Sequence, residues 1–548
     1  MRIALAQLNY IIGDFDLNKS KIIETIETCR QQGAELVVFA ELSVCGYPPR
    51  DFLEFDDFID KSYQAIGTIA AHCNGIAAIV GAPSRNPDIK GKNLFNSAWL
   101  LADGKVHSLA HKALLPTYDI FDEYRYFEPC RTFDCIIYKG VKIALTICED
   151  IWNLVPDPLY VASPMDVLHA QHPDLMINIA ASPFNYDQQE TRLGILRTNT
   201  AQYRIPLVYV NQVGAQTELL FDGNSCVLDS TGNTIASCNA FAEGICMFDF
   251  DIETKTVQSE LPVAEAETGK TALIHDALVM GIRDYFAKMG FTKAILGLSG
   301  GIDSAVTLAL AAEALGSENV YAVLLPSEYS SGHSVDDAVA LAVNLNCKYD
   351  IISIKDGYTS ILGSLQPYFK ELPFSVAEEN IQARVRAVLL MGLANKFGYI
   401  LLNTSNKSEA AVGYGTLYGD MCGGISVLGD VYKTEVYELA HHINREREII
   451  PVNSIVKPPS AELRPGQKDS DSLPEYDILD KILYNYIELR QSPADLIASG
   501  FDEATVKRVL RMVNMNEWKR HQTPPILRVS PKAFGQGRRM PIVGRYLS

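Results

Sequence analysis

The chain has 548 residues, of which 47% are hydrophobic and 21% charged, the balance of an ordinary soluble globular protein. At about 150 residues per domain, this length excludes one core and allows two large domains or three to four smaller ones. A net charge of −18 argues against an extended nucleic-acid surface, which needs a basic stripe. The 11 cysteines are scattered singly, without zinc-site spacing, so reduced thiols are expected.

Neither a membrane span nor a targeting segment is indicated. No apolar run reaches the ~18 residues that a membrane helix needs. Residues Met1 to Leu8 enter a strand pattern at once and lack the layout of a signal peptide. The sequence therefore predicts a cytoplasmic protein without membrane or nucleic-acid partners.

The first 250 residues alternate short β-rich runs with helical ones. Seven near-continuously apolar runs are expected as strands: Arg2 to Leu8, Leu36 to Glu41, Ala77 to Gly81, Ala98 to Ala102, Lys142 to Cys148, Leu175 to Ala180 and Pro206 to Asn211. Such strands are buried on both faces, which predicts a layered α/β domain. The pattern dissolves between Asp249 and Lys270, so residues 1–250 are assigned to a first domain and 251–270 to a linker.

Residues 271–548 carry a second set of α/β units. A helix is expected around Leu273 to Met289, and strands are expected at Ala294 to Leu296, Val320 to Leu325, Tyr349 to Ile354 and Tyr399 to Asn403. This alternation predicts a doubly wound parallel sheet. Residues 457–475 are rich in Pro, Gly and charge, which is typical of a long mobile loop that closes over a ligand.

A phosphate-binding loop stands between the strand at Ala294 and a helix expected at Ala305 to Leu315. It consists of Gly297, Leu298, Ser299, Gly300, Gly301, Ile302, Asp303 and Ser304. At such a junction the first N–H groups of the helix are unpaired and favour an anion. The Asp303 carboxylate repels phosphate and is expected to hold a cation, for which Mg²⁺ is suited. No Gly-Lys-Ser/Thr follows the glycines, which argues against a kinase or a GTPase.

The run Ser-Gly-Gly-x-Asp-Ser resembles the pyrophosphate loop of the N-type ATP pyrophosphatases, which cleave ATP to AMP and pyrophosphate while adenylylating a substrate oxygen. Beyond it, Thr404, Lys407 and Glu409 are expected to project from the end of a strand. Further matching stretches are Leu325 to Ser331, Glu378 to Arg386, Gly413 to Asp420, Gly429 to Thr434, Lys457 to Leu463 and Asn516 to Arg520. Together they resemble the NAD synthetase family across most of residues 270–548.

That resemblance implies specific binding roles in the second half. Residues 297–304 and Thr404 are implied to bind ATP. Asp303 and Glu409 are implied to bind Mg²⁺. Asn380, Glu409 and Lys519 are implied to contact deamido-NAD.

Three residues of the first half stand at or near strand ends: Glu41, Lys112 and Cys148. With their flanks, Glu41 to Pro49, His111 to Tyr118 and Ile147 to Trp152, they resemble the nitrilase family over nearly all of residues 1–250. The resemblance implies a four-layer αββα sandwich and amide hydrolysis. Cys148 is then the nucleophile and Glu41 its general base. Lys112 and the backbone N–H of Glu149 stabilise the oxyanion.

L-glutamine is the amide implied by relatives that are fused to a synthetase. Tyr118 and Ser182 match positions that line its pocket, and Glu123 matches a second glutamate near the lysine. Gln188 stands where many relatives carry a basic residue. Arg192 lies one helical turn further on.

The two resemblances together imply ATP-dependent amidation of deamido-NAD to NAD through an adenylate, with ammonia from glutamine and release of AMP and pyrophosphate. A GMP or asparagine synthetase shares the phosphate loop, but the nitrilase-like half and the stretch Asn380 to Arg386 argue against both. A degenerate scaffold at residues 1–250 is the remaining alternative, which the intact Glu41, Lys112 and Cys148 disfavour. Relatives form homo-oligomers, so at least a dimer is expected.

Overall fold

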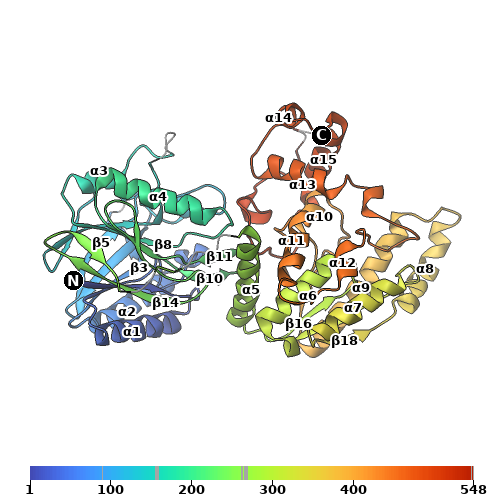
Figure 1. The fold of residues 1–548 in the computed structure, drawn as a ribbon, viewed down its shortest axis with the longest axis horizontal. Helices are drawn as coiled ribbons and strands as arrows, with labels where there is room; N and C mark the ends of the chain where they lie inside the picture. The colour runs from blue at the N-terminus through green and yellow to red at the C-terminus, as the bar shows by residue number, and fades with distance from the viewer. Residues whose placement is uncertain (89, 155–158, 261–262, 265–268, 545, 547–548) are drawn as a thin grey trace. The chain divides into compact units, whose positions relative to one another are not determined.

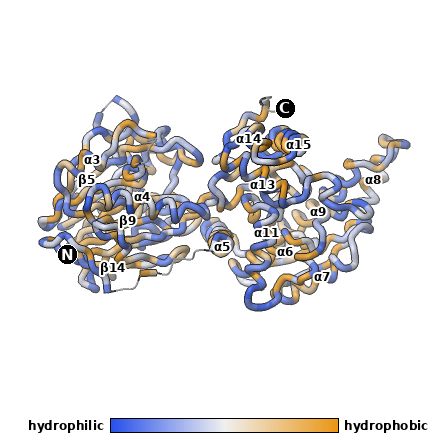
Figure 2. Tube along the Cα trace, turned by 45° about the horizontal axis from the view of Figure 1, so that its top comes forward, coloured by the Kyte–Doolittle hydropathy of each residue, from blue (hydrophilic) through white to orange (hydrophobic). Residues whose placement is uncertain are grey.

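The chain forms two compact units, Met1–Glu267 and Thr268–Ser548. The computed structural model describes every residue except 89, 155–158, 261–262, 265–268, 545 and 547–548 (Figure 1). Hydrophobic residues are interspersed with hydrophilic ones throughout both units (Figure 2). In keeping with this, none of the helices within the described ranges is long and apolar enough to cross a membrane.

Unit 1 is built on two large sheets. The first has the order β15-β14-β1-β2-β3-β4-β5, with strands Thr256–Gln258, Gly244–Asp251, Arg2–Gln7, Leu36–Val38, Ala77–Arg85, Leu94–Ala102 and Lys105–His111. The second has the order β13-β12-β9-β8-β7-β6, with strands Thr234–Ser237, Cys226–Leu228, Leu207–Asn211, Leu175–Ala180, Val141–Ile147 and Ile136–Tyr138. A separate ribbon pairs β10 (Val213–Gln216) with β11 (Leu219–Asp222).

Alternation along β1 shows why the two sheets stack. Ile3 and Leu5 point into a core shared with strands of the second sheet, whereas Ala4 and Ala6 pack in another core that includes Ile22 of α1 (Phe15–Gln31). Helices α1 and α2 (Asp56–Ala71) thus cover the outer face of the first sheet. On the far side of unit 1 lie α3 (Pro164–His169) and α4 (Gln188–Tyr203) (Figure 1). This arrangement confirms the four-layer αββα sandwich.

The segment expected as a linker is partly structured. Residues 256–258 form β15, which pairs antiparallel with β14 in the first sheet, and α5 (Lys270–Met289) begins at the last expected linker residue. Within the segment expected as a linker, residues 256–258 thus extend the first sheet through a hairpin with β14, in which Asp251 lies opposite Thr256. Residues 261–262 and 265–268 lie outside the described residues.

Unit 2 contains a five-stranded parallel sheet of order β18-β17-β16-β19-β20. Its strands are Lys348–Ile351, Val320–Leu324, Ala294–Gly297, Ile400–Asn403 and Ile425–Ser426. The helices that follow in the chain are α6 (Ile302–Leu315), α7 (Gly332–Asn344), α8 (Lys355–Phe369), α9 (Val376–Phe397), α10 (Lys407–Val412), α11 (Lys433–Ile443), α12 (Val452–Val456), α13 (Tyr476–Ile487), α14 (Pro493–Ala498), α15 (Glu503–Met515) and α16 (Glu517–Arg520). The doubly wound parallel sheet is confirmed.

The strand order places a ligand site at one edge of this sheet. The chain runs from β16 outward to β18 and then returns to β19, on the other side of β16. Connections leave β16 and β19 in opposite directions, which opens a crevice at their carboxyl ends. Ile295 of β16 and Val323 of β17 pack against Val385 of α9, so the sheet face below the crevice is covered. The phosphate loop follows β16 directly into this crevice.

Candidate active sites

Lys112 stands between two glutamates in the interior of unit 1. Its Nζ lies 2.7 Å from Glu41 Oε1 and 2.8 Å from Glu123 Oε2, and the lysine and Glu41 are fully buried. Burial by itself lowers the pKa of Lys112, but the charges of Glu123 and Glu41 outweigh it and raise the pKa well above its usual value. Lys112 is therefore a fixed positive charge in a place that excludes water.

Backbone and amide donors orient the two glutamates. Glu41 Oε1 also accepts a hydrogen bond from Asn96 Nδ2 at 2.6 Å, and Oε2 accepts from the N–H of Ala181 at 2.9 Å. The Tyr47 hydroxyl donates to Glu123 at 2.9 Å. Burial, and further the charge of Glu41, raise the pKa of Glu123 to about 7 despite the neighbouring lysine.

Cys148 follows β7 in a sharp turn that begins a short 3₁₀ helix, Cys148–Ile151. Its φ of 46° is the left-handed conformation, which a non-glycine residue adopts only when the surroundings hold it. Asp150 braces the turn by accepting from the N–H of Ile147 at 3.0 Å, and from Ala113 and Leu114 at 2.9 Å. Burial and then the charge of Glu41 raise the pKa of the Cys148 thiol well above its usual value. The thiol is accordingly protonated at rest and needs a base.

A carboxylate next to the thiol is clamped by two tyrosines. Glu149 is buried, and it accepts from the Tyr118 hydroxyl at 2.9 Å and from the Tyr160 hydroxyl at 3.2 Å. Burial raises its pKa. Tyr118 was expected from the sequence, whereas Tyr160 was missed because it comes from a loop without any motif. Asn153 fixes that loop through hydrogen bonds to residues 160 and 162.

The remaining expected glutamine-site residues lie around the start of α4. Ser182 is buried, with its backbone N–H bonded to Asn211 at 2.9 Å, and Gln188 is the first residue of α4. Arg192 is 2% exposed and forms a two-pronged ion pair with Asp222, at 3.1 and 2.5 Å. Arg192 is therefore committed to the interior and does not supply a cation in place of Gln188.

In unit 2 a cavity of about 290 Å³ opens at the crevice of the sheet. Of the expected ATP residues, those lining it are Gly297, Leu298, Ser299, Gly301, Ile302, Asp303, Ser304 and Thr404. The loop supports itself: Ser304 Oγ donates to the carbonyl of Gly301 at 3.0 Å, and the N–H of Gly301 donates to Ser299 Oγ at 3.2 Å. The loop is thus shaped before any ligand binds.

Gly300 has a different role from the other loop residues. Its φ is 79°, and a Cβ added there would meet the carbonyl oxygen of Ser334 at 2.1 Å. Glycine is therefore required because the loop packs directly against the first turn of α7.

Asp303 lies near Glu409, with a lysine between them. Lys433 Nζ contacts Asp303 Oδ2 and lies 3.9 Å from Glu409 Oε1. Asn406 donates to Asp303 Oδ1 at 2.9 Å, and its own Oδ1 accepts from the N–H of Glu409 at 2.9 Å. Loss of hydration, and next the charge of Asp303, raise the pKa of Glu409 well above its usual value. Lys433 was not singled out from the sequence.

The metal expectation fits this donor set. Mg²⁺ typically binds one or two protein carboxylates together with substrate phosphates and water, and Asp303 and Glu409 line the cavity beside the phosphate loop. No group of three or more His, Cys, Asp or Glu side chains is arranged for a metal within the part of the chain that the structure describes. The protein by itself therefore offers a partial set of ligands that phosphates would complete.

Two of the residues expected to contact deamido-NAD lie beyond the cavity lining. Asn380 accepts from the Thr416 hydroxyl at 2.6 Å, and Lys519 Nζ donates to the carbonyls of Gly413 and Gly415 at 2.8 and 3.1 Å. Both thus meet on the loop 413–416, and the third, Glu409, lines the cavity. Lys407, by contrast, is fully buried and pairs with Asp430 at 2.8 Å. Lys407, expected to project from the strand end with Thr404 and Glu409, instead has its side chain in the interior.

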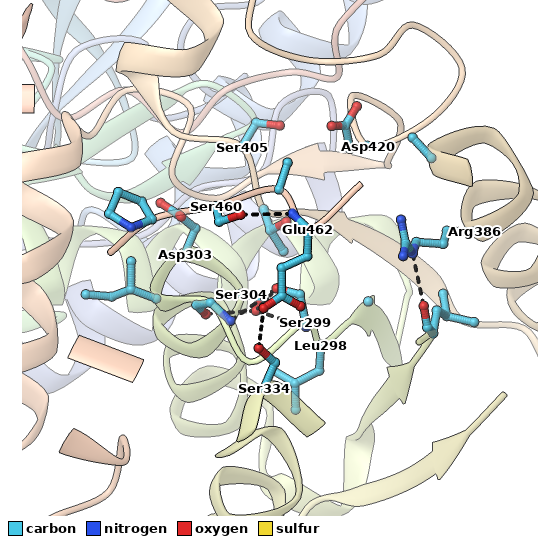
Figure 3. Close-up of a pocket in the computed structure, with 18 of the residues that line it drawn as sticks. Leu298, Ser299, Asp303, Ser304, Ser334, Arg386, Ser405, Asp420, Ser460 and Glu462 are labelled. Atoms are coloured by element: carbon cyan, nitrogen blue, oxygen red, sulfur yellow. Dashed lines mark hydrogen bonds between the residues drawn. The ribbon is translucent and has the colours of Figure 1, made fainter. Parts of the chain in front are cut away.

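The segment 457–463 forms one wall of the cavity. Glu462 points from it toward the start of α7, where its Oε1 accepts from Ser334 Oγ at 2.6 Å (Figure 3). The same oxygen accepts from Ser331 Oγ at 3.1 Å. Lys457 Nζ lies 3.3 Å from the same carboxylate. These contacts hold the segment against the cavity in this structure.

Two family models match the chain. The carbon-nitrogen hydrolase model covers residues 2–257, and the NAD synthase model covers residues 274–523. A glutamine-dependent NAD(+) synthetase of Synechocystis sp. is 44% identical over 98% of each chain. One of Acinetobacter baylyi is 42% identical over 99% of this chain and 98% of the relative.

A solved structure gives the same result. The glutamine-dependent NAD+ synthetase from Acinetobacter baumannii, in complex with adenosine diphosphate, is 40% identical to this chain. It aligns with a TM-score of 0.79 over 99% of this chain and 98% of that one.

The fold and the two matched halves define a nitrilase-type hydrolase joined to an ATP-using synthetase in one chain. The full-length relatives narrow this further: the chain belongs to the glutamine-dependent NAD(+) synthetase family. It is a carbon-nitrogen ligase that uses ATP to amidate deamido-NAD, with glutamine as the amido donor. The expectations for family, fold class and overall reaction are confirmed.

Proposed function

We propose that the two half-reactions use Cys148 in unit 1 and the cavity beside Asp303 in unit 2. The single observation that supports the first assignment is the buried cluster of Lys112, Glu41 and Glu123. It lies near Cys148, whose backbone is in the left-handed conformation. Such a cluster is costly to bury, because each ion loses its hydration. Perturbed, buried titratable groups of this kind mark functional sites.

Glutamine hydrolysis proceeds as follows in the proposed mechanism. Glu41 takes the proton of Cys148 as the thiol attacks the side-chain amide carbon, and it passes this proton to the amide nitrogen, so that ammonia leaves and a thioester forms. Glu41 then takes a proton from a water molecule that attacks the thioester, which releases glutamate and returns the proton to the Cys148 sulfur. Lys112 stabilises the developing oxyanion, aided by the N–H of Glu149. Glu123 keeps the Lys112 ammonium in place. Tyr118, Ser182 and Gln188 contact the glutamine itself.

Neither Gln188 nor Arg192 supplies a free cation for the glutamine carboxylate, so we infer that this carboxylate is recognised by neutral groups. Gln188 is uncharged, and Arg192 is paired with Asp222. The Glu149 carboxylate, held by Tyr118 and Tyr160, is a negative group close to the thiol. The proposed site therefore matches the amino end of an amino acid better than its carboxylate end.

In unit 2 the carboxylate of deamido-NAD must be activated, since ammonia does not attack a resonance-stabilised anion. We assign residues 297–304 and Thr404 to ATP, and Asn380, Glu409 and Lys519 to deamido-NAD. Mg²⁺ held by Asp303 and Glu409 would stabilise the charge on the departing pyrophosphate. The unpaired backbone N–H groups at the N-terminus of α6 would donate hydrogen bonds to the same negatively charged phosphates. An adenylate with AMP as its leaving group is the proposed intermediate.

The proposal also includes the cellular compartment and the assembly state of the enzyme. All 11 cysteines are unpaired thiols, which agrees with a reducing cytoplasm. We expect a homo-oligomer, at least a dimer, and small-molecule substrates as the only other partners.

The test supplies ATP, Mg²⁺ and deamido-NAD with either glutamine or ammonium, and products are identified by mass. Cys148→Ala should lose at least ~10³-fold of the glutamine-dependent rate and keep the ammonium-dependent rate within about twofold. Cys130→Ala is the matched control, because that thiol is only partly buried and lies outside the cluster. Omitting both nitrogen donors should let an adenylate accumulate. Equal loss with both donors would refute the two-site assignment.

A further inference from the structure

A buried ammonium occupies the place where the proposed metal would sit. Lys433 is the first residue of α11, and its side chain is 3% exposed. Its Nζ contacts Asp303 Oδ2 and lies 3.9 Å from Glu409 Oε1, while Asn406 holds the other Asp303 oxygen at 2.9 Å. Both oxygens of Asp303 are thus already used by the chain itself.

The surroundings explain why a cation is needed there without any ligand. Asp303, Glu409 and Asp469 all line this cavity. Asp469 is held by the hydroxyls of Tyr414 and Tyr476 at 3.1 and 3.0 Å. Carboxylates gathered in a poorly hydrated place repel one another unless a positive charge lies among them. Lys433 supplies that charge.

We propose that Lys433 is an internal counter-ion that fills the cation position of the nucleotide-free enzyme and yields it only to a metal that arrives with ATP. The inference rests on the proposed metal roles of Asp303 and Glu409. A divalent ion that enters alone meets the lysine ammonium, whose charge repels it. Metal binding is therefore coupled to nucleotide binding.

ATP supplies negative phosphate oxygens that can replace the carboxylates as partners of the Lys433 ammonium. Phosphates bound at the start of α6 would lie next to Asp303, which is the second residue of that helix. The ammonium then exchanges one oxygen partner for another over a short distance, since the lysine stem has four rotatable bonds. The carboxylates that it leaves become available to the metal.

Lys457 offers a matched comparison within the same cavity. It lines the cavity as Lys433 does, but its Nζ pairs with Glu462 at 3.3 Å and contacts Ser334, rather than Asp303 or Glu409. Replacing Lys457 by methionine changes the net charge of the cavity by the same one unit as replacing Lys433, but it leaves the contact of Lys433 with Asp303 in place. Only Lys433 is expected to control metal entry.

The experiment measures Mn²⁺ binding to the full-length protein from the paramagnetic resonance signal of unbound Mn²⁺. It is done with and without α,β-methylene ATP, an analogue in which a methylene group replaces the oxygen between the α- and β-phosphorus atoms, where the reaction would cleave ATP. Wild-type protein should bind Mn²⁺ at least tenfold more tightly with the analogue. Lys433→Met should bind Mn²⁺ at least tenfold more tightly than wild type without nucleotide. Lys433→Arg should restore the weak binding, and Lys457→Met should leave it unchanged.

The proposal is overturned if Lys433→Met binds Mn²⁺ as weakly as wild type, or if wild type binds Mn²⁺ equally well without the analogue. A gain of binding does not arise from misfolding, and Lys433→Gln decides the matter if the methionine variant does not fold. Asp303→Asn separates this inference from the proposed metal site. If that variant still binds Mn²⁺ normally with the analogue, the ligand assignment itself is wrong.

Discussion

Replacing Glu41 by glutamine tests the glutaminase site with almost no change of shape. Glu41 accepts three buried hydrogen bonds, from Lys112 at 2.7 Å, Asn96 at 2.6 Å and the N–H of Ala181 at 2.9 Å. The amide of a glutamine accepts on one oxygen only. Its NH₂ group is therefore expected to turn toward Ala181, so that the remaining oxygen keeps Lys112 and Asn96.

The cost to folding follows from this arrangement. One charge-assisted hydrogen bond is lost, and Lys112 keeps Glu123 as its only carboxylate partner, so Glu41→Gln should lower the free energy of unfolding by about 2–3 kcal/mol. The loss of a general base should reduce the glutamine-dependent kcat/KM by about 10²–10⁴-fold, equivalent to about 3–5 kcal/mol of barrier.

The assay compares NAD formation with glutamine and with ammonium, alongside thermal unfolding. The ammonium-dependent rate should stay within about twofold of wild type, because that reaction bypasses Glu41. Glu35→Gln is the control, since Glu35 pairs with Lys139 at the surface and should affect neither donor. A glutamine-dependent kcat/KM within threefold of wild type for Glu41→Gln would refute Glu41 as the base.

Three further outcomes are expected. Asp303→Asn should reduce pyrophosphate release equally with both nitrogen donors, since it removes a metal-facing charge, and near-normal release would limit Asp303 to a loop-stabilising role. Protease cleavage within residues 457–475 should slow when ATP and deamido-NAD are both added. Without ligands, cleavage should be faster in Glu462→Gln than in the wild-type protein. A cleavage rate that does not change with ligands would show that the segment does not close over them. Burial lowers the pKa of His275, but Asp276 and Glu313 outweigh it and raise the pKa to about 9 from 6.5. The protonated histidine should add about 1–2 kcal/mol to the free energy of unfolding, a value reduced because the two carboxylates are about half exposed. This contribution should be complete below pH 6.5 and should be lost as the pH rises through 9. Urea unfolding across this pH range should show the loss in the wild-type protein and not in His275→Gln.

Features encoded within a few consecutive residues were predictable from the sequence. The apolar runs located β1, β7, β8 and β9 to within a residue or two, because buried strands carry their signal in every side chain. The loop at residues 297–304 was equally local, since glycines and hydroxyl residues stand directly between a strand and a helix.

Pairings across long distances in the chain were not predictable from local patterns. Lys433 meets Asp303 from 130 positions further along the chain, and Arg192 is neutralised by Asp222, 30 positions away. Both look like available cations in the sequence. Lys407 shows the same limit, because its strand-end position suggests a site residue while its ion pair with Asp430 removes it to the interior.

The two sites use a lysine between carboxylates for opposite purposes. Lys112 is held by Glu41 and Glu123, which are 0% and 6% exposed, so no incoming charge can compete for it, and it remains a fixed positive group. Lys433 is held by Asp303 and Glu409, which are 17% and 18% exposed where they line the cavity, so phosphates can reach it. Burial therefore separates a permanent electrostatic catalyst from an exchangeable counter-ion. On this argument, Lys112→Arg should fail in a space without room for rearrangement, whereas Lys433→Arg should retain its function.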